Sequence, residues 1–298
     1  MEYIVTDLEW DNVYFKPEKR FINQILQIGA VKLNDDFEII DSLDIIVRSE
    51  ISNKVTGRFA KLTGITSEIM REGMPFKEAV EKYNSFVKNA DVTMTWSDSD
   101  LYTILENEDF RLKDGLKFKL NYYLDLQKFV QQELYKRGYE SKNQIALEAA
   151  ADFLGLNTEG FEFHTAVDDC RVSAELFKIS YDKARFESLV KDTSDKSFFK
   201  RLRFKPYPIS DINDTDIKPS ELEFSCPECN GKTTRITNWK YINRWFISNF
   251  KCQKCGFKFN GRVAFKRTYD EVKVKHKVCE YKPKKRKNND VQSVSEKV

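Results

Sequence analysis

Carboxylates in three short segments are the residues of this chain whose types and spacing could do chemistry. Asp7 and Glu9 stand two positions apart at the end of the apolar run 3–8. Side chains alternate along a strand, so both carboxylates project from the same side and can hold a cation between them. Their mutual repulsion has to be relieved by a proton or a metal ion. The alternative is a strand that simply ends in a solvated loop.

Two later segments add further carboxylates and an imidazole. Asp98 and Asp100 follow a strand-like run and precede a helical one, and ligands collect at such junctions on the edge of an α/β sheet. Capping the helix is the competing role, and it suits Asp98 better. His164 comes just before a predicted helix, and Asp169 lies in the first turn of that helix. A packed or surface histidine is the competing interpretation of His164.

Together these segments supply the oxygen ligands that two divalent ions such as Mg²⁺ or Mn²⁺ require. The predicted metal ligands are Asp7, Glu9, Asp100 and Asp169, with His164 beside them. Two such ions about 3.5–4 Å apart can activate a water and stabilise the leaving oxygen in phosphodiester cleavage. His164 would accept the proton of the attacking water as a general base, because an imidazole titrates near neutral pH.

Four of the six cysteines predict a second metal site. They form two Cys-x2-Cys pairs separated by residues 230–251, namely Cys226, Cys229, Cys252 and Cys255. Four thiolates at this spacing are typical of a tetrahedral structural Zn²⁺ site. Redox-active cysteine pairs are the alternative. The segment resembles a zinc ribbon, and we expect Cys170 to be a buried packing residue outside it.

Charge divides the chain in two. Residues 1–200 contain 27 Lys and Arg against 36 Asp and Glu, whereas residues 201–298 contain 23 against 11. In the basic part, aromatic and cationic residues interleave, as in 239–241 and 244–246. Such a surface can follow phosphates while its rings stack on bases. The alternative is that a small ribbon needs its aromatic residues as a core.

The elements that must position the carboxylates read as an α/β domain, because short β-rich runs alternate with helical patterns. Runs 3–8, 25–33 and 38–47 predict an antiparallel meander, and run 92–96 predicts a fourth strand. Helical spacing predicts a helix over 75–87. Another is predicted over 141–154, where Ser141 and Gln144 form a capping box, and a further one begins near Thr165.

The pattern divides the chain into four parts. Residues 1–185 are predicted to form the catalytic domain, 186–221 a polar linker, 222–275 the zinc-ribbon module, and 276–298 a basic, disordered tail. The basic cluster PKKRK, residues 283–287 of that tail, is either a nuclear address or a contact to nucleic acid.

Composition excludes several classes of protein. A chain of 298 residues with 41% hydrophobic residues can fill a core, which argues against global disorder. No run approaches the roughly 18 apolar residues of a membrane span, and the first residues carry acids where a signal peptide carries bases. Six cysteines in such a chain are typical of intracellular thiols or metal ligands. We therefore expect a cytoplasmic protein without a membrane partner.

The order Asp-x-Glu, Asp, His-x4-Asp resembles the DEDDh class of 3′–5′ exonucleases, in the proofreading-exonuclease and RNase T superfamily. The resemblance covers about residues 1–183 and includes the segments ILQIGAVKL and FHTAVDDCRVSAELF. DLEW, TWSDSDL and YYLDLQKFV are most similar to the branch of KapD-like and Eri1-like exonucleases. It implies an RNase H-like mixed β-sheet flanked by helices. It also implies that Asp100 rather than Asp98, and Asp169 rather than Asp168, bind metal.

The resemblance further implies hydrolysis of single-stranded nucleic acid from the 3′ end to nucleoside 5′-monophosphates, with RNA favoured over DNA. One departure is that Trp10 and Asp11 stand where proofreading members often have Thr-Thr-Gly. The rival hypothesis is an adaptor that keeps the fold, performs no chemistry and binds nucleic acid through the zinc ribbon. An endonuclease of the wider RNase H-like group is a third hypothesis.

Overall fold

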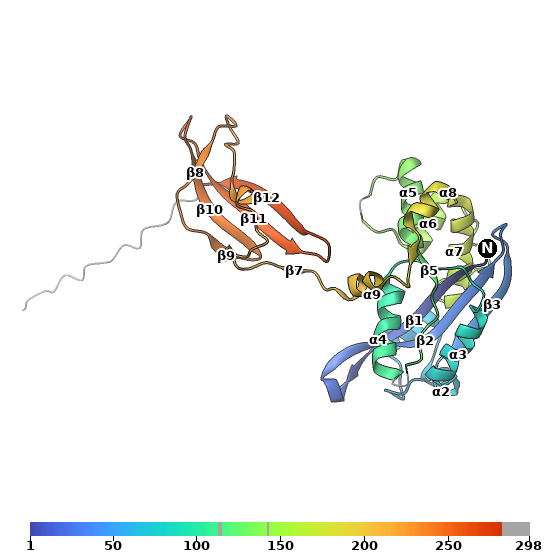
Figure 1. Cartoon of the computed structure of the whole chain (residues 1–298). Helices are drawn as coiled ribbons and strands as arrows, with labels where there is room; N and C mark the ends of the chain where they lie inside the picture. The colour runs from blue at the N-terminus through green and yellow to red at the C-terminus, as the bar shows by residue number, and fades with distance from the viewer. Residues whose placement is uncertain (113–114, 142, 282–298) are drawn as a thin grey trace, which may run out of the picture. The chain divides into compact units, whose positions relative to one another are not determined.

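The computed structural model describes residues 1–112, 115–141 and 143–281, and the chain separates into two compact units (Figure 1). The first unit is Met1–Leu202, and the second begins at Arg203. Each has its own hydrophobic core. Among the described residues, every helix is either too short or too polar to cross a bilayer.

A six-stranded mixed sheet forms the centre of the first unit. Its strands lie in the order β3-β2-β1-β4-β5-β6. β1–β2, β2–β3 and β5–β6 pair antiparallel, whereas β1–β4 and β4–β5 pair parallel. The strands are β1 Tyr3–Phe15, β2 Arg20–Leu33, β3 Ile39–Ile46, β4 Val92–Thr95, β5 Tyr122–Asp125 and β6 Lys191–Asp192. The predicted opening meander is thus present.

Helices cover both faces of this sheet, because apolar side chains of β1 alternate between two cores. Ile4 and Leu8 pack with α3 (Phe76–Phe86), α4 (Ser99–Arg111) and α9 (Lys196–Arg203). Tyr3 and Val5 pack on the other face with four helices, α5 Leu126–Lys136, α6 Leu147–Leu154, α7 Ala166–Ser180 and α8 Lys183–Leu189. The short helices α1 (Gly57–Thr63) and α2 (Ser67–Glu72) follow β3 along the chain. The fold is therefore the predicted mixed sheet flanked by helices.

The first strand runs past the predicted end at Leu8 and continues to Phe15, paired with β2 along its length. Asp7 and Glu9 therefore lie within a strand, and the expectation that they stand at a strand end is wrong. Pairing of β1 with β4, however, stops at Val5. Asp7 and Glu9 come directly after the point where β1 and β4 separate, so one edge of β1 has no partner strand beside them among the described residues.

The helix predicted from Ser141 begins only at Leu147, with Ala146 at its N-terminal cap. The carbonyl of Ile145 accepts hydrogen bonds from the side chains of Trp96 (3.3 Å) and Gln127 (2.7 Å). These tertiary bonds hold Ile145 outside the helix. Ser141 Oγ instead accepts a bond from the Asn143 amide, so the predicted capping box is absent.

The segment expected as a linker contributes to both units. β6 pairs with β5, and Leu202 of α9 is buried in the first core beside Phe198. Ile209 and Ile217 are buried in the second core. Regularly spaced apolar residues inside a polar composition account for the difference, because they bury one face of each segment.

The second unit is a β-sheet with strand order β12-β11-β10-β8, to which β7 and β9 add at β11 and β10. Its strands are β7 Tyr207–Pro208, β8 Thr233–Arg235, β9 Lys240–Ile242, β10 Trp245–Cys252, β11 Lys258–Arg267 and β12 Val272–Glu280. β12 pairs with β11 over its whole length, so the disordered tail expected from residue 276 does not begin there. Residues 282–298 of that predicted tail lie outside the described residues.

Candidate active site

β1 places Asp7 and Glu9 on the face of the sheet that carries α7, because they share the alternation of Tyr3 and Val5. A register shift against β2 follows immediately, between Glu9 and Trp10. Such bulges redirect side chains beside active sites. Both carboxylates are half-buried.

α4 supplies Asp100 from the C-terminal end of β4. The Leu8 amide donates a hydrogen bond to Asp100 Oδ1 at 3.1 Å, which ties this buried carboxylate to the backbone between Asp7 and Glu9. Asp98 occupies the N-cap position of α4 and forms an ion pair with Lys128 at 3.5 Å. The two aspartates thus have separate surroundings, and only Asp100 bonds to β1.

The start of α7 supplies His164 and Asp169. His164 is exposed and has a left-handed backbone with φ of 68°. Its amide donates to Asp169 Oδ2 at 3.3 Å. One ligand atom each from Glu9, His164 and Asp169 lie within 4.8 Å of one another. Asp168 instead pairs with Arg171 and accepts from the Glu162 amide.

Gly29 lets α7 approach this site. It pairs with Asp7 across β1 and β2. A Cβ at this position would lie 2.4 Å from the carbonyl carbon of Ala166 and 2.6 Å from the amide nitrogen of Val167. The Ala166 amide also lies 3.4 Å from Gln27 Oε1, within hydrogen-bonding distance. The backbone of α7 therefore rests on β2 beside the Asp7 position.

Burial of the carboxylates, together with their mutual charges, weakens their acidity. Burial, reinforced by the charges of Asp100, Asp169 and Glu9, raises the pKa of Asp7 well above its ordinary value. Burial and the charges of Asp169 and Asp100 raise the pKa of Glu9 to about 8. Burial likewise raises the pKa of Asp100 to about 7, against the opposing hydrogen bonds from backbone amides, and the pKa of Asp169 to about 6.

The donor set fits divalent cations. Asp169 Oδ1 is buried and has no hydrogen-bond partner among the described residues. A bound cation would give this oxygen a partner. It would also offset the repulsion between the neighbouring carboxylates. All the converging carboxylates offer hard oxygen ligands, which Mg²⁺ and Mn²⁺ prefer.

The structure brings the sequence-predicted residues of the three segments to one place. Glu9, His164 and Asp169 form one cluster, and Asp7 and Asp100 interact electrostatically with it. Gly29, Gln27 and the Leu8 amide were not predicted. A lone glycine in an apolar strand was the available signal for Gly29, since such glycines mark close backbone approach. Cys170 is buried in the core, as expected.

The four cysteines of the second unit form the other cluster. Sγ–Sγ distances are 3.6 Å for Cys226–Cys255 and 3.5 Å for Cys229–Cys252 and Cys229–Cys255. A tetrahedron with Zn–S bonds of about 2.3 Å has edges of roughly 3.8 Å, so the four thiols fit zinc. Gly256, with φ of 74°, closes the second knuckle in the left-handed conformation.

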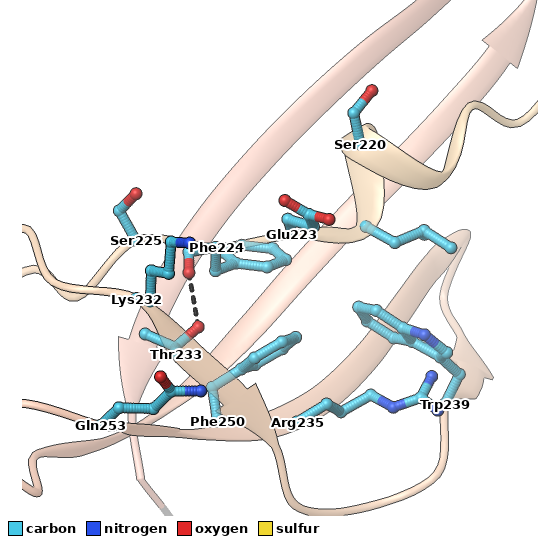
Figure 2. A pocket seen from close by; sticks show the side chains of 11 residues that line it. Ser220, Glu223, Phe224, Ser225, Lys232, Thr233, Arg235, Trp239, Phe250 and Gln253 are labelled. Atoms are coloured by element: carbon cyan, nitrogen blue, oxygen red, sulfur yellow. Dashed lines mark hydrogen bonds between the residues drawn. The ribbon is translucent and has the colours of Figure 1, made fainter.

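A cavity of about 770 Å³ lies in the second unit, lined by residues between Ser220 and Gln253. Figure 2 shows Arg235 beside Trp239, and its guanidinium carbon lies 5.6 Å from the ring centre. Glu223 also lines the cavity, together with Lys232. Its lining therefore carries charges of both signs.

Residues 15–177 match the model of the RNase T family, which is described as an exonuclease family. Among curated proteins, the chain is 29% identical over 224 residues to the PolC-type DNA polymerase III of Clostridium perfringens, covering 73% of this chain but 14% of the polymerase. It is 27% identical over 172 residues to the probable 3′-5′ exonuclease KapD of Bacillus subtilis, covering 57% of this chain and 79% of KapD. The chain thus spans only a small part of its polymerase relative.

A solved structure has the same fold in the first unit. The nuclease domain of 3′hExo, described as a DEDDh family member bound to rAMP, matches with a TM-score of 0.50 and 21% sequence identity. The match covers 60% of this chain and 90% of that domain.

Proposed function

Because the chain belongs to the RNase T exonuclease family, we propose that it is a metal-dependent 3′–5′ exonuclease. Its substrate is single-stranded RNA or DNA, and its products are nucleoside 5′-monophosphates. The convergence of Asp7, Glu9, Asp100 and Asp169 beside His164 is the observation that carries this proposal.

Each residue has a role in the proposed reaction. Asp7, Glu9, Asp100 and Asp169 would hold two Mg²⁺ or Mn²⁺ ions. These ions would supply the Lewis acidity that stabilises negative charge developing on the scissile phosphate. His164, exposed at the edge of the cluster, accepts a proton from the attacking water. Its left-handed backbone, with φ of 68°, costs conformational energy, as is common at functional sites.

The similar proteins bear on polarity and substrate. KapD is named a probable 3′-5′ exonuclease, and the 3′hExo nuclease domain is described as bound to rAMP, a ribonucleotide. We favour RNA over DNA for this reason. The polymerase relative keeps DNA in consideration. The cysteine cluster would hold a structural Zn²⁺ that keeps the second unit folded.

Polarity, sugar preference and metal dependence can be measured together with matched RNA and DNA oligonucleotides. With Mg²⁺ or Mn²⁺, a 3′-labelled strand should release labelled mononucleotide at once, while a 5′-labelled strand should shorten stepwise. His164→Gln should lower kcat by about 10²- to 10⁴-fold, since that is the usual contribution of a general base. Asp7→Ala should remove activity as well.

The other histidine of the chain provides a matched control. His276 lies in the second unit and bonds to the Glu221 carbonyl, so His276→Gln should retain the wild-type rate. Intact RNA and DNA after incubation with either metal ion, with Asp7→Ala indistinguishable from wild type, would favour the adaptor hypothesis. Cuts within a circular strand would favour an endonuclease.

A further inference from the structure

One face of the sheet in the second unit concentrates positive charge. Strand alternation puts the apolar residues of β11, such as Val263 and Phe265, into the core, and the residues between them on the opposite face. On this outward face β9–β12 carry Lys240, Lys251, Lys258, Arg262, Lys266, Lys273, Lys275 and Lys277. The same positions of these strands carry no Asp or Glu.

Six of these eight cations stand directly opposite one another. Strand register pairs Lys251 with Lys258, Arg262 with Lys277, and Lys266 with Lys273. Like charges in directly opposed positions destabilise a sheet. Lys273 has one loose ion pair, at 3.9 Å with Glu271 of the adjoining turn. These opposed cations destabilise the sheet unless a ligand neutralises them. Binding of a polyanion would remove their repulsion.

Apolar and aromatic side chains lie among the cations. Trp245 and Ile242 are paired on this face, and Ile242 is 49% exposed. Trp245 is half-buried at the wall of a hollow of about 440 Å³, together with Lys266, Lys273 and Lys275. Ligand sites of small molecules commonly have volumes of about 300–1,000 Å³, so one nucleotide fits.

The turn between β9 and β10 adds a further cation to the rim of the hollow. Asn243 and Arg244 both have left-handed backbones, with φ of 50° and 66°. This is the geometry of a two-residue hairpin turn that matches the twist of its strands. Arg244 is exposed and lines the hollow. The lining residues include three lysines and this arginine, and no carboxylate.

We propose that the outward face of β9–β12 binds single-stranded nucleic acid, with phosphates along its rows of Lys and Arg and a base in the hollow against Trp245. The choice of a nucleic acid rests on the proposed function. The choice of a single strand rests on two features of the face, its row of cations and the ring of Trp245. An unpaired base can stack on this ring, whereas a base in a duplex already stacks on its neighbours.

Binding can be measured apart from hydrolysis. The full-length protein, in buffer freed of Mg²⁺ and Mn²⁺ but with zinc retained, is titrated against a fluorescent 12-nucleotide single strand of RNA or DNA. Lys266→Gln/Lys275→Gln should weaken binding about 10-fold and lower the slope of log affinity against log salt by about 1.4, since each neutralised phosphate contributes roughly 0.7. Trp245→Ala should also weaken binding about 10-fold.

Two controls separate charge from folding. Lys266→Arg/Lys275→Arg keeps the charge and should retain the affinity. Lys61→Gln/Lys82→Gln removes the same charge from exposed positions of α1 and α3 and should bind as wild type does. Unchanged affinity of the Lys266→Gln/Lys275→Gln variant overturns the proposal. So does tighter binding of a duplex, or equal displacement of the strand by polyglutamate of matched charge.

The outcome is distinguishable from that of the catalytic proposal. A protein that binds the strand but releases no nucleotide with Mg²⁺ or Mn²⁺ contradicts only the exonuclease. A protein that degrades the strand while its face variants bind normally contradicts only this surface.

Discussion

The carboxylates of the candidate active site are held together against their own repulsion. Glu9, Asp100 and Asp169 have raised pKa values of about 8, 7 and 6 because they are buried near one another. In an unfolded chain such groups titrate near 4. The folded, ion-free protein therefore binds more protons than the unfolded chain between these limits.

This difference predicts how stability depends on pH. The contribution of these groups to the stability of the ion-free protein is greatest below about pH 4 to 5. This contribution is lost as pH rises through their folded pKa values. We expect Tm to fall by about 5–10 °C between pH 5.5 and 8.5, because each pKa unit corresponds to roughly 1.4 kcal/mol before screening. Mg²⁺ should restore Tm at the higher pH by binding the ionised site.

Thermal melts at fixed ionic strength test this expectation, with zinc retained throughout. Glu9→Gln removes one of the titrating groups and should flatten the curve in ion-free buffer. A Tm that rises with pH in the absence of Mg²⁺ would contradict the electrostatic account of the site.

Sequence patterns reveal these residues better than they reveal what supports them. Asp7 and Glu9 are recognisable because strand alternation puts positions two apart on one side. The family resemblance favoured Asp100 over Asp98, but it did not give the physical reason. The distinction depends on the Leu8 amide and on Lys128, both distant along the chain. Long-range contacts of this kind produce no regular spacing of residues in the sequence, so the sequence pattern does not reveal them.

At the scale of elements, the position of α7 depends on β2. The meander was predictable because its strands are long and apolar, whereas the start of α6 and the packing of α9 depend on tertiary contacts. The contact between Gly29 and Ala166 is of the second kind. It places the segment that carries His164 and Asp169 beside β1.

Gly29→Ala should therefore disturb both stability and catalysis. The added methyl group meets backbone atoms of α7 that cannot move independently of the helix. We expect destabilisation of about 1–3 kcal/mol, which is the usual cost of overpacking. Displacement of the His164 segment should lower kcat by about 10- to 100-fold. Thermal melts and mononucleotide release measure the two effects.

Gly57→Ala is the matched control, since a Cβ at Gly57 meets no atom within 4 Å and its backbone is helical. It should leave activity and Tm near those of wild type. Full activity of Gly29→Ala would show that the approach of α7 to β2 does not set the site.

At the scale of the whole molecule, the candidate active site and the proposed strand-binding face belong to two units with separate hydrophobic cores. The first core surrounds the mixed sheet, and the second fills one side of the C-terminal sheet next to the cysteine cluster. The charge division between residues 200 and 201 lies next to this separation, whereas the sequence pattern placed the end of the first domain at residue 185. The boundary near Leu202 was not predicted, because the buried face of α9 is short and embedded in polar residues.

Removal of one zinc ligand should affect the second unit alone. Cys252→Ser should reduce bound zinc from one ion per chain to nearly none, and the calorimetric transition of the second unit should be lost, because structural zinc supplies folding energy. The transition of the first unit should shift by less than about 2 °C, since that unit has its own hydrophobic core. Cys279 lies outside the cluster, so Cys279→Ser should keep zinc. Retention of zinc by Cys252→Ser would contradict the four-thiolate site.

The glycine beside Asp7 also limits how the candidate active site can evolve. A hydrogen atom is the smallest substituent that a residue can carry, and at Gly29 it already occupies the available gap. A larger residue at position 29 can only push the segment that carries His164 away from β2. Substitution at this position can therefore widen the distance between β2 and α7 but cannot shorten it. Adjustments toward a tighter or differently shaped site are left to the other elements that hold the carboxylates, namely α4 and the bulge after Glu9.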